Sequence, residues 1–241
     1  MRVIILAAGQ GSRLKPLTDY TPKPLLPIAG SSVLIRLIDR VSAQPVSNIT
    51  IVVGHEKERV KNEVFNAFGN RVRIVENDRY LEDTNILSLV LALAENESPF
   101  IVFESDVVFE DSSLDLIFDS RLQSFSSWYT IGPFQLNQVG GILKANQEGW
   151  VTDLRIVKQF EDQYRDYKKL VGILKVSENE APRYIKLLHA AALKNTRQYY
   201  LMPWINNLDK LPCIETDLSK TRVGAFNTIE EYEAMLRLFK S

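Results

Sequence analysis

The stretch VIILAAGQGSRLKPLT, residues 3–18, joins a short apolar run to a loop that contains two glycines. The apolar residues 3–6 form a continuous run that ends shortly before Gly9, which predicts a fully buried strand. Gly9 and Gly11 then favour a loop in which the backbone can approach a ligand closely. The chain therefore begins with a buried strand that leads directly into a candidate binding loop.

Outward from this stretch, apolar runs alternate with apolar residues at helical spacing up to about residue 106. We expect strands at 3–6, 49–53, 72–75 and 100–103, separated by helices over 33–41, 60–68 and 87–93. This alternation predicts an α/β fold, in which a Rossmann-like, mostly parallel sheet carries helices on both faces. Ligands of such sheets bind at the carboxyl ends of the strands, where Gly9 and Asp106 are expected to lie.

The pattern changes after residue 125, where strands follow one another with few helices between them. We expect strands at 128–131, 141–145, 151–156 and 170–176, a helix at 182–194, a strand at 223–226 and a final helix from Ile229. Thr228 and Glu231 have the spacing of a capping box at the start of that last helix. This region predicts a mixed or antiparallel C-terminal extension. We expect one domain over 1–241, with a core at 1–124, an elaboration at 125–220 and a closing strand and helix at 221–241.

Composition excludes several classes of protein. The formal net charge of the 241 residues is −1, so no large positive field points to nucleic acid or to an anionic membrane. No apolar run is long enough for membrane insertion. A single cysteine, Cys213, excludes an internal disulfide framework and favours a cytoplasmic location. Recognition of a phosphorylated ligand must therefore depend on a local cluster of charges.

Gly9, Gly11, Arg13 and Lys23 provide such a cluster. Glycines allow successive backbone N–H groups to point at an anion, while a guanidinium and an ammonium add positive charge. A P-loop is excluded because the Gly-Lys-Ser/Thr triplet is absent. A dinucleotide-binding loop is excluded because Leu14 stands where a third glycine is required. The loop therefore predicts a site for a polyphosphate.

The string GQGSRLKPLT, followed by Thr21-Pro22-Lys23-Pro24, resembles the G-x-G-[ST]-R-L-x-P-x-T…P-K-P motif of nucleotidyltransferases that act on sugar phosphates or alcohol phosphates. Residues 77–89 resemble most the branch with bacterial CTP:phosphocholine cytidylyltransferases, through Asn77, Tyr80, Thr84-Asn85 and Ser88-Leu89. The resemblance covers most of the chain, strongly to residue 106 and more loosely beyond. It implies a nucleotide site formed by Leu6, Ala8, Gly9, Gly11, Ser12, Arg13, Lys23, Asn77, Thr84, Asn85 and Ser88.

The resemblance also implies a Mg²⁺ site with one ligand after the fourth strand and one before the last helix. Asp106 matches the first position and Asn227 the second. Mg²⁺ is commonly held by one or two protein oxygens together with phosphates and water, so two ligands suffice. Glu104 is either a further ligand or a simple carboxylate at the end of a strand. Arg13, Lys23 and Asp106 are the expected catalytic residues.

For the acceptor, the resemblance implies a basic residue in the second half of the chain, where Lys158 is the best match. It also implies an aromatic residue at Trp204 with an acidic neighbour, but Ile205 stands in that place. This departure argues against phosphocholine. Aminoethylphosphonate, polyol phosphates and phosphorylated amino-acid derivatives remain open. An aromatic box for a cationic acceptor has these candidates: Trp128, Tyr129, Trp150, Tyr199, Tyr200 and Trp204.

We therefore expect a Mg²⁺-dependent cytidylyltransferase that uses CTP and a small alcohol phosphate or phosphonate and releases pyrophosphate. The alternatives are a sugar-1-phosphate nucleotidyltransferase that uses UTP, dTTP or GTP, and a non-catalytic nucleotide-binding regulator. Intact Arg13, Lys23 and Asp106 argue against the regulator. The sequence gives no prediction of oligomeric state.

Overall fold

The computed structural model describes residues 1–93, 99–119 and 124–240. Within these ranges the strands are β1 Arg2–Ala7, β2 Pro27–Ile28, β3 Ser31–Ser32, β4 Asn48–Val53, β5 Arg73–Glu76, β6 Phe100–Glu104, β7 Val107–Phe109, β8 Ser126–Pro133, β9 Gly140–Ala145, β10 Val151–Val157, β11 Lys168–Val176, β12 Cys213–Asp217 and β13 Val223–Ala225. The helices are α1 Leu17–Tyr20, α2 Val33–Ser42, α3 Lys57–Phe68, α4 Ile86–Ala92, α5 Asp111–Ile117, α6 Ala181–Lys194, α7 Met202–Ile205 and α8 Ile229–Leu238.

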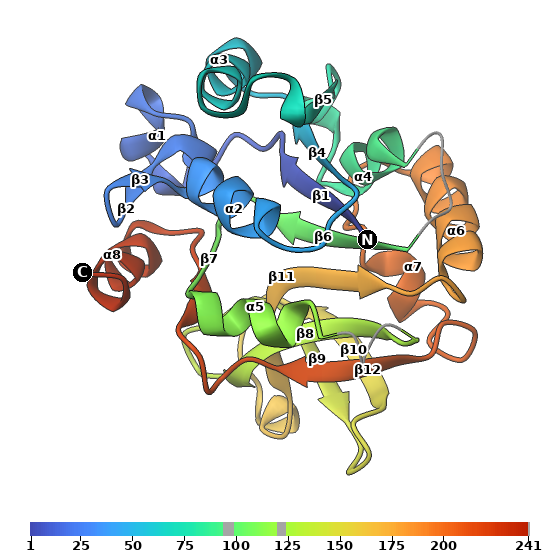
Figure 1. Cartoon of the computed structure of the whole chain (residues 1–241). Coiled ribbons are helices and arrows are strands. Elements are labelled where there is room, and N and C mark those ends of the chain that lie inside the picture. The colour runs from blue at the N-terminus through green and yellow to red at the C-terminus, as the bar shows by residue number, and fades with distance from the viewer. Residues whose placement is uncertain (94–98, 120–123, 241) are drawn as a thin grey trace.

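One large sheet runs through the molecule (Figure 1). Its main path has the order β10-β9-β11-β6-β1-β4-β5, and β8 and β12 extend it from β11. Strands β6, β1, β4 and β5 are parallel neighbours, whereas β11 pairs antiparallel with β6. The expected fold class is confirmed: a mostly parallel Rossmann-like core continues into antiparallel strands of the second half of the chain.

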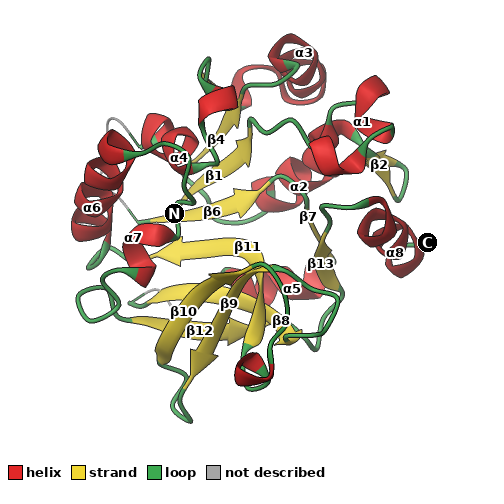
Figure 2. Cartoon of the chain, turned by 180° about the vertical axis from the view of Figure 1, so that it is seen from behind, coloured by secondary structure: helices red, strands yellow, loops and turns green. Residues whose placement is uncertain are grey.

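Strand β1 separates two hydrophobic cores, because alternate residues of a strand face opposite sides of the sheet. Val3, Ile5 and Ala7 pack in the core beneath α2, α3 and α5. Ile4 and Leu6 pack in the other core with α4, α6 and Trp204. Figure 1 shows α2 and α5 in front of the sheet, and Figure 2 shows α4, α6 and α7 from the opposite side. Burial on both faces explains why the strand reads as an unbroken apolar run.

Some elements differ from those expected from sequence. Strand β12 pairs parallel with β8, and β13 pairs antiparallel with β7 in a separate two-stranded ribbon. Neither β7, β12 nor α5 was expected. The sequence of β12, CIETD, is only partly apolar and its burial alternates weakly, so it lacks the continuous run that marks the central strands.

Among the described residues, no helix is long and apolar enough to cross a membrane.

The capping box expected at α8 is present. The Thr228 hydroxyl accepts a hydrogen bond from the backbone N–H of Glu231 at 3.3 Å. In return, the Glu231 carboxylate accepts hydrogen bonds from the backbone N–H groups of Thr228, at 3.2 Å, and of Asn227, at 2.6 Å. The capping box therefore fixes the backbone of Asn227 as well as the N-terminus of α8.

Candidate active site

A cleft with a volume of about 260 Å³ lies at the carboxyl ends of β1 and β6. Segments far apart in the sequence form its walls: the loop after β1, the turn at Lys23, the segment before and at the start of α4, the end of β6, the segment between α6 and α7 at Tyr199, and Asn227 between β13 and α8. The lining residues are Leu6, Ala8, Gly9, Gly11, Ser12, Arg13, Lys23, Pro24, Tyr80, Asp83, Thr84, Asn85, Ser88, Glu104, Ser105, Asp106, Tyr199 and Asn227.

The glycine-rich loop depends on Gly11 for its shape. Gly11 has φ +65°, in the left-handed region, and precedes a short 3-10 turn at Ser12–Leu14. A Cβ atom at this position would lie 2.8 Å from Cβ of Lys23 and 3.2 Å from Cγ2 of Thr18. The missing side chain therefore lets the loop pack directly against the backbone that carries Lys23.

We predict that Gly11→Ala reduces both stability and activity. The strained backbone and the contact with Lys23 should lower the free energy of unfolding by about 1–3 kcal/mol. They should also displace Lys23 and Arg13, so that the two cations no longer contact the same bound phosphorylated ligand. Chemical denaturation and steady-state kinetics measure the two effects. Gly9→Ala is a matched control for the contact, because a Cβ at Gly9 meets no atom within 4 Å. Equal losses of stability from the two substitutions would contradict this role of Gly11.

Two cations and two oxygen ligands meet in the cleft. The Lys23 ammonium donates to Oδ2 of Asp106 at 2.5 Å and to Oδ1 of Asn227 at 2.9 Å. The Arg13 guanidinium donates to the same Asn227 oxygen at 2.9 Å. Asp106 is 4% exposed, so its charge is held away from bulk water beside the Lys23 ammonium. The residues expected to bind phosphate and those expected to bind metal are therefore in direct contact.

The donor set fits a Mg²⁺ ion. Oδ1 of Asp106 is buried and has no hydrogen-bond partner among the described residues, although buried carboxylate oxygens are normally satisfied. The oxygens of Asp106 and Asn227 contact the same ammonium nitrogen, so they lie close enough to share one cation. A carboxylate and an amide oxygen are hard ligands of the kind that Mg²⁺ prefers. Mg²⁺ binding itself remains a prediction.

Glu104 adds a second carboxylate to the cleft. Desolvation by the surrounding protein, followed by repulsion from Asp106, raises the pKa of Glu104 to about 7, while Lys23, Lys169 and the Tyr200 hydroxyl oppose this rise. Lys169 lies nearby and donates to the Leu170 carbonyl at 3.0 Å. Burial lowers the pKa of Lys169, and attraction to Glu104 acts in the opposite direction. Closely spaced titratable side chains with shifted pKa values are common in functional sites.

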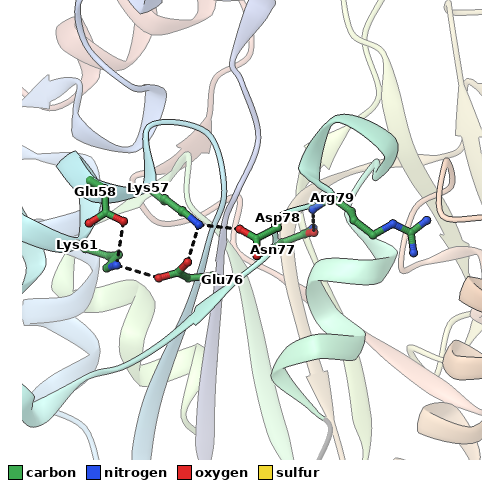
Figure 3. Close-up of polar contacts among 7 residues, drawn as sticks. All are labelled: Lys57, Glu58, Lys61, Glu76, Asn77, Asp78 and Arg79. Carbon is green, nitrogen blue, oxygen red and sulfur yellow. Dashed lines mark hydrogen bonds and ion pairs between the residues drawn. The ribbon is translucent and has the colours of Figure 1, made fainter.

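A hydrogen-bonded network forms the wall beside α4. Asp83 accepts hydrogen bonds from the Asn77 amide, from the Ser88 hydroxyl and from the backbone N–H groups of Leu87 and Ser88. Asn77 is 1% exposed; it lies behind this wall and does not line the cleft. Its side-chain oxygen accepts from the backbone N–H of Arg79 at 3.0 Å, as Figure 3 shows.

An exposed ion network holds the end of β5 next to this wall. Lys57 of α3 pairs with Glu76 and Asp78, and Lys61 pairs with Glu76 and Glu58 (Figure 3). Surface pairs of this kind contribute little individually. Together they connect α3 to the residues on either side of Asn77.

The structure brings together most of the residues that the sequence suggests. All the expected nucleotide-binding residues except Asn77 line the cleft, as do Asp106 and Asn227. The two expected acceptor residues do not line it. Lys158 is exposed just after β10. Trp204 is fully buried. Its ring centroid lies 4.9 Å from that of Tyr184 and 6.0 Å from that of Trp128, which it meets edge-on. In this conformation Trp204 therefore supports the core. Their contacts with an acceptor remain predictions.

Other lining residues were missed as site residues. Asp83 and Tyr80 belong to the segment that carried the resemblance, but no role was assigned to them. Tyr199 was only one of several aromatic candidates, and it is the one of these that lines the cleft. Lys169 does not line the cleft but interacts with Glu104, and it gave no signal in the sequence because it lies inside a strand, where a lysine usually points to solvent. Its neighbour Lys168 does pair with partly exposed Asp217.

Cations suited to a polyphosphate and oxygens suited to a divalent cation share this cleft, which is what nucleotidyl transfer requires. The fold and the cleft thus define a protein of the nucleotidyltransferase class. A family model described as the MobA-like NTP transferase domain matches residues 3–123, and the chain belongs to this family. The resemblance seen in the sequence is confirmed.

Individual relatives agree with this assignment. The 2-aminoethylphosphonate cytidylyltransferase of Lancefieldella rimae is 33% identical over 199 residues, which cover 78% of this chain and 72% of the relative. Bifunctional protein GlmU of Methanococcus aeolicus is 33% identical over 123 residues, 49% of this chain; the match spans only 28% of that longer relative. The structure of CTP:phosphocholine cytidylyltransferase from Streptococcus pneumoniae superposes with a TM-score of 0.84 over 99% of both chains at 21% identity, which shows a shared fold.

Proposed function

We propose that this protein is a Mg²⁺-dependent cytidylyltransferase that transfers CMP from CTP to a small phosphonate or alcohol phosphate. The observation that carries the proposal is the contact of Arg13 and Lys23 with Asn227 and Asp106 inside the cleft. The choice of CTP and of a phosphonate is supported by the relative that acts on 2-aminoethylphosphonate, because the similarity extends over most of both chains.

In the proposed reaction an acceptor oxygen forms a bond to the α-phosphorus of CTP, and the bond from that phosphorus to the bridging oxygen breaks. Pyrophosphate leaves with the bonding electrons. A phosphonate carries a nucleophilic oxygen that is already ionised near neutral pH, so no protein base is needed. Catalysis then depends on position and on charge neutralisation.

Each residue of the cleft has a proposed role in this reaction. The loop at Gly9 and Gly11 and the Arg13 guanidinium hold the β- and γ-phosphates. Lys23 neutralises charge at the α-phosphate as the bond to pyrophosphate breaks. Asp106 and Asn227 would hold Mg²⁺, which supplies Lewis-acid stabilisation and a template for phosphate oxygens when bound.

A pyrophosphate-release assay tests the proposal. CTP, UTP, dTTP and GTP are each combined with 2-aminoethylphosphonate, phosphocholine, a polyol phosphate and glucose 1-phosphate, with Mg²⁺ present. We expect release above background with CTP and a phosphonate or alcohol phosphate. A clear preference for UTP, dTTP or GTP with the sugar phosphate would instead establish the alternative, a sugar-1-phosphate nucleotidyltransferase. The match to GlmU supports this alternative only in part, because it spans 49% of this chain and 28% of that relative.

A further inference from the structure

Asp83 lies in a wall of the cleft and accepts hydrogen bonds from the neighbouring side chains of Asn77 and Ser88. The Ser88 hydroxyl donates to Oδ2 of Asp83 at 2.7 Å. The Asn77 amide nitrogen donates to the same oxygen and to the Ser88 hydroxyl, both at 2.9 Å. The backbone N–H of Ser88 adds a third bond to Oδ2 at 2.9 Å. The donors of Asn77 and Ser88 are therefore turned toward Asp83.

The two carboxylate oxygens of Asp83 are used unequally. Oδ2 accepts the three hydrogen bonds from Asn77 and Ser88, whereas Oδ1 accepts one hydrogen bond within the described part of the chain, from the backbone N–H of Leu87 at 3.0 Å. An ionised carboxylate accepts about four hydrogen bonds over its two oxygens and donates none. Oδ2 is thus saturated, and Oδ1 keeps the capacity to accept from a group in the cleft, which Asp83 lines.

Asp83 is also held rigidly in place. Its bonds to Leu87 and Ser88 cap the first turn of α4, and buried Asn77 fixes it from behind. Asn77 is itself anchored through its oxygen by the backbone of Arg79 (Figure 3). A preorganised acceptor discriminates strongly, because a ligand that lacks the matching donor leaves it unpaired.

We infer that Asp83 is a specificity-determining residue that recognises the exocyclic amine of a nucleobase and so selects CTP over UTP. Cytosine presents an N4 amine at the position where uracil presents an O4 carbonyl oxygen. A carboxylate accepts a hydrogen bond from that amine, and it repels the carbonyl oxygen. This inference rests on the proposed use of CTP and names the side chain that reads the base.

Equilibrium binding of CTP and UTP, each with Mg²⁺, tests this inference without any acceptor. In the wild-type protein CTP should bind more tightly. Asp83→Asn should keep an oxygen for the Ser88 side of the network and place an NH₂ group at the Oδ1 position. We expect it to reduce the ratio of CTP to UTP affinity by about tenfold or more. UTP affinity should be unchanged or improved.

Two further variants separate recognition from support of α4. Glu82→Gln makes the same change on the adjacent, exposed carboxylate, which pairs with Arg79 and does not line the cleft, and should leave the ratio unchanged. Asp83→Ser retains one acceptor for the helix and should also lower the ratio, which provides a second test if Asp83→Asn does not fold.

The outcomes are distinct. Equal losses of CTP and UTP affinity in the Asp83 variants would overturn the inference and leave the proposed function intact, since Asp83 would then only support the helix. A wild-type protein that prefers UTP, or that binds neither nucleotide, would overturn the proposed function and this inference together.

Discussion

Asp106→Ala should lower kcat by at least about 1,000-fold while the protein remains folded. The substitution removes the buried Oδ1, which has no hydrogen-bond partner within the described ranges, and the Oδ2 that contacts Lys23. In the proposed reaction these oxygens hold the ion that neutralises charge on the phosphates. Folding should be largely preserved, because Lys23 keeps Asn227 as a partner and repulsion between Asp106 and Glu104 is removed. Pyrophosphate release and thermal denaturation measure the two effects.

Two comparisons make this result specific. Asp106→Asn retains the shape and one oxygen but loses the charge, so its activity should fall between that of the wild type and that of Asp106→Ala. Asp115→Ala changes an exposed aspartate of α5 and should leave kcat unaltered. If Asp106→Ala retained wild-type turnover and wild-type dependence on Mg²⁺, the assignment of Asp106 as a metal ligand would be wrong.

Lys23→Met should lower kcat/KM for the nucleotide by at least about 100-fold, because one charged contact to the reacting phosphates is lost. It should also lower the free energy of unfolding by about 1–3 kcal/mol, since the buried carboxylate of Asp106 loses its charged partner. Single-turnover kinetics and chemical denaturation measure these effects. Lys23→Arg restores the charge but not the compact ammonium geometry, so it should rescue stability more than activity.

Lys15 provides the matched control for Lys23. Its side chain is 63% exposed, pairs with Asp19 four residues later and does not line the cleft. Lys15→Met should change neither kcat/KM nor stability by more than a small amount. Similar losses for both lysine variants would mean that general positive charge, rather than the position of Lys23, drives nucleotide binding.

The core of the fold could be predicted because its central strands, β1, β4 and β6, are buried on both faces. Such strands read as continuous apolar runs, and their order along the chain implies parallel neighbours. The convergence of Gly9 with Asp106 followed from the same reasoning, since both come after neighbouring strands, β1 and β6. Strands β7 and β12 were missed because a three-residue strand and a partly polar strand carry no such run.

The second half of the site could not be predicted in the same way. Side chains such as Lys169 and Tyr199 reach the Glu104 region or the cleft through long-range pairing and packing, which local periodicity does not encode. Trp204 and Lys158 were chosen by position within a looser part of the resemblance. The structure instead places the Trp204 ring among core aromatics and exposes Lys158.

The pairing of β6 with β11 has a consequence for folding. The family model ends at residue 123, yet the edge of β6 that faces away from β1 is covered by β11, from residues 168–176. A fragment cut near residue 124 would leave Phe100–Glu104 as an uncovered, strongly apolar edge strand. Such an edge is a template for association with other chains. We therefore expect the fragment to aggregate, so that the nucleotide-binding half depends on the second half for its solubility.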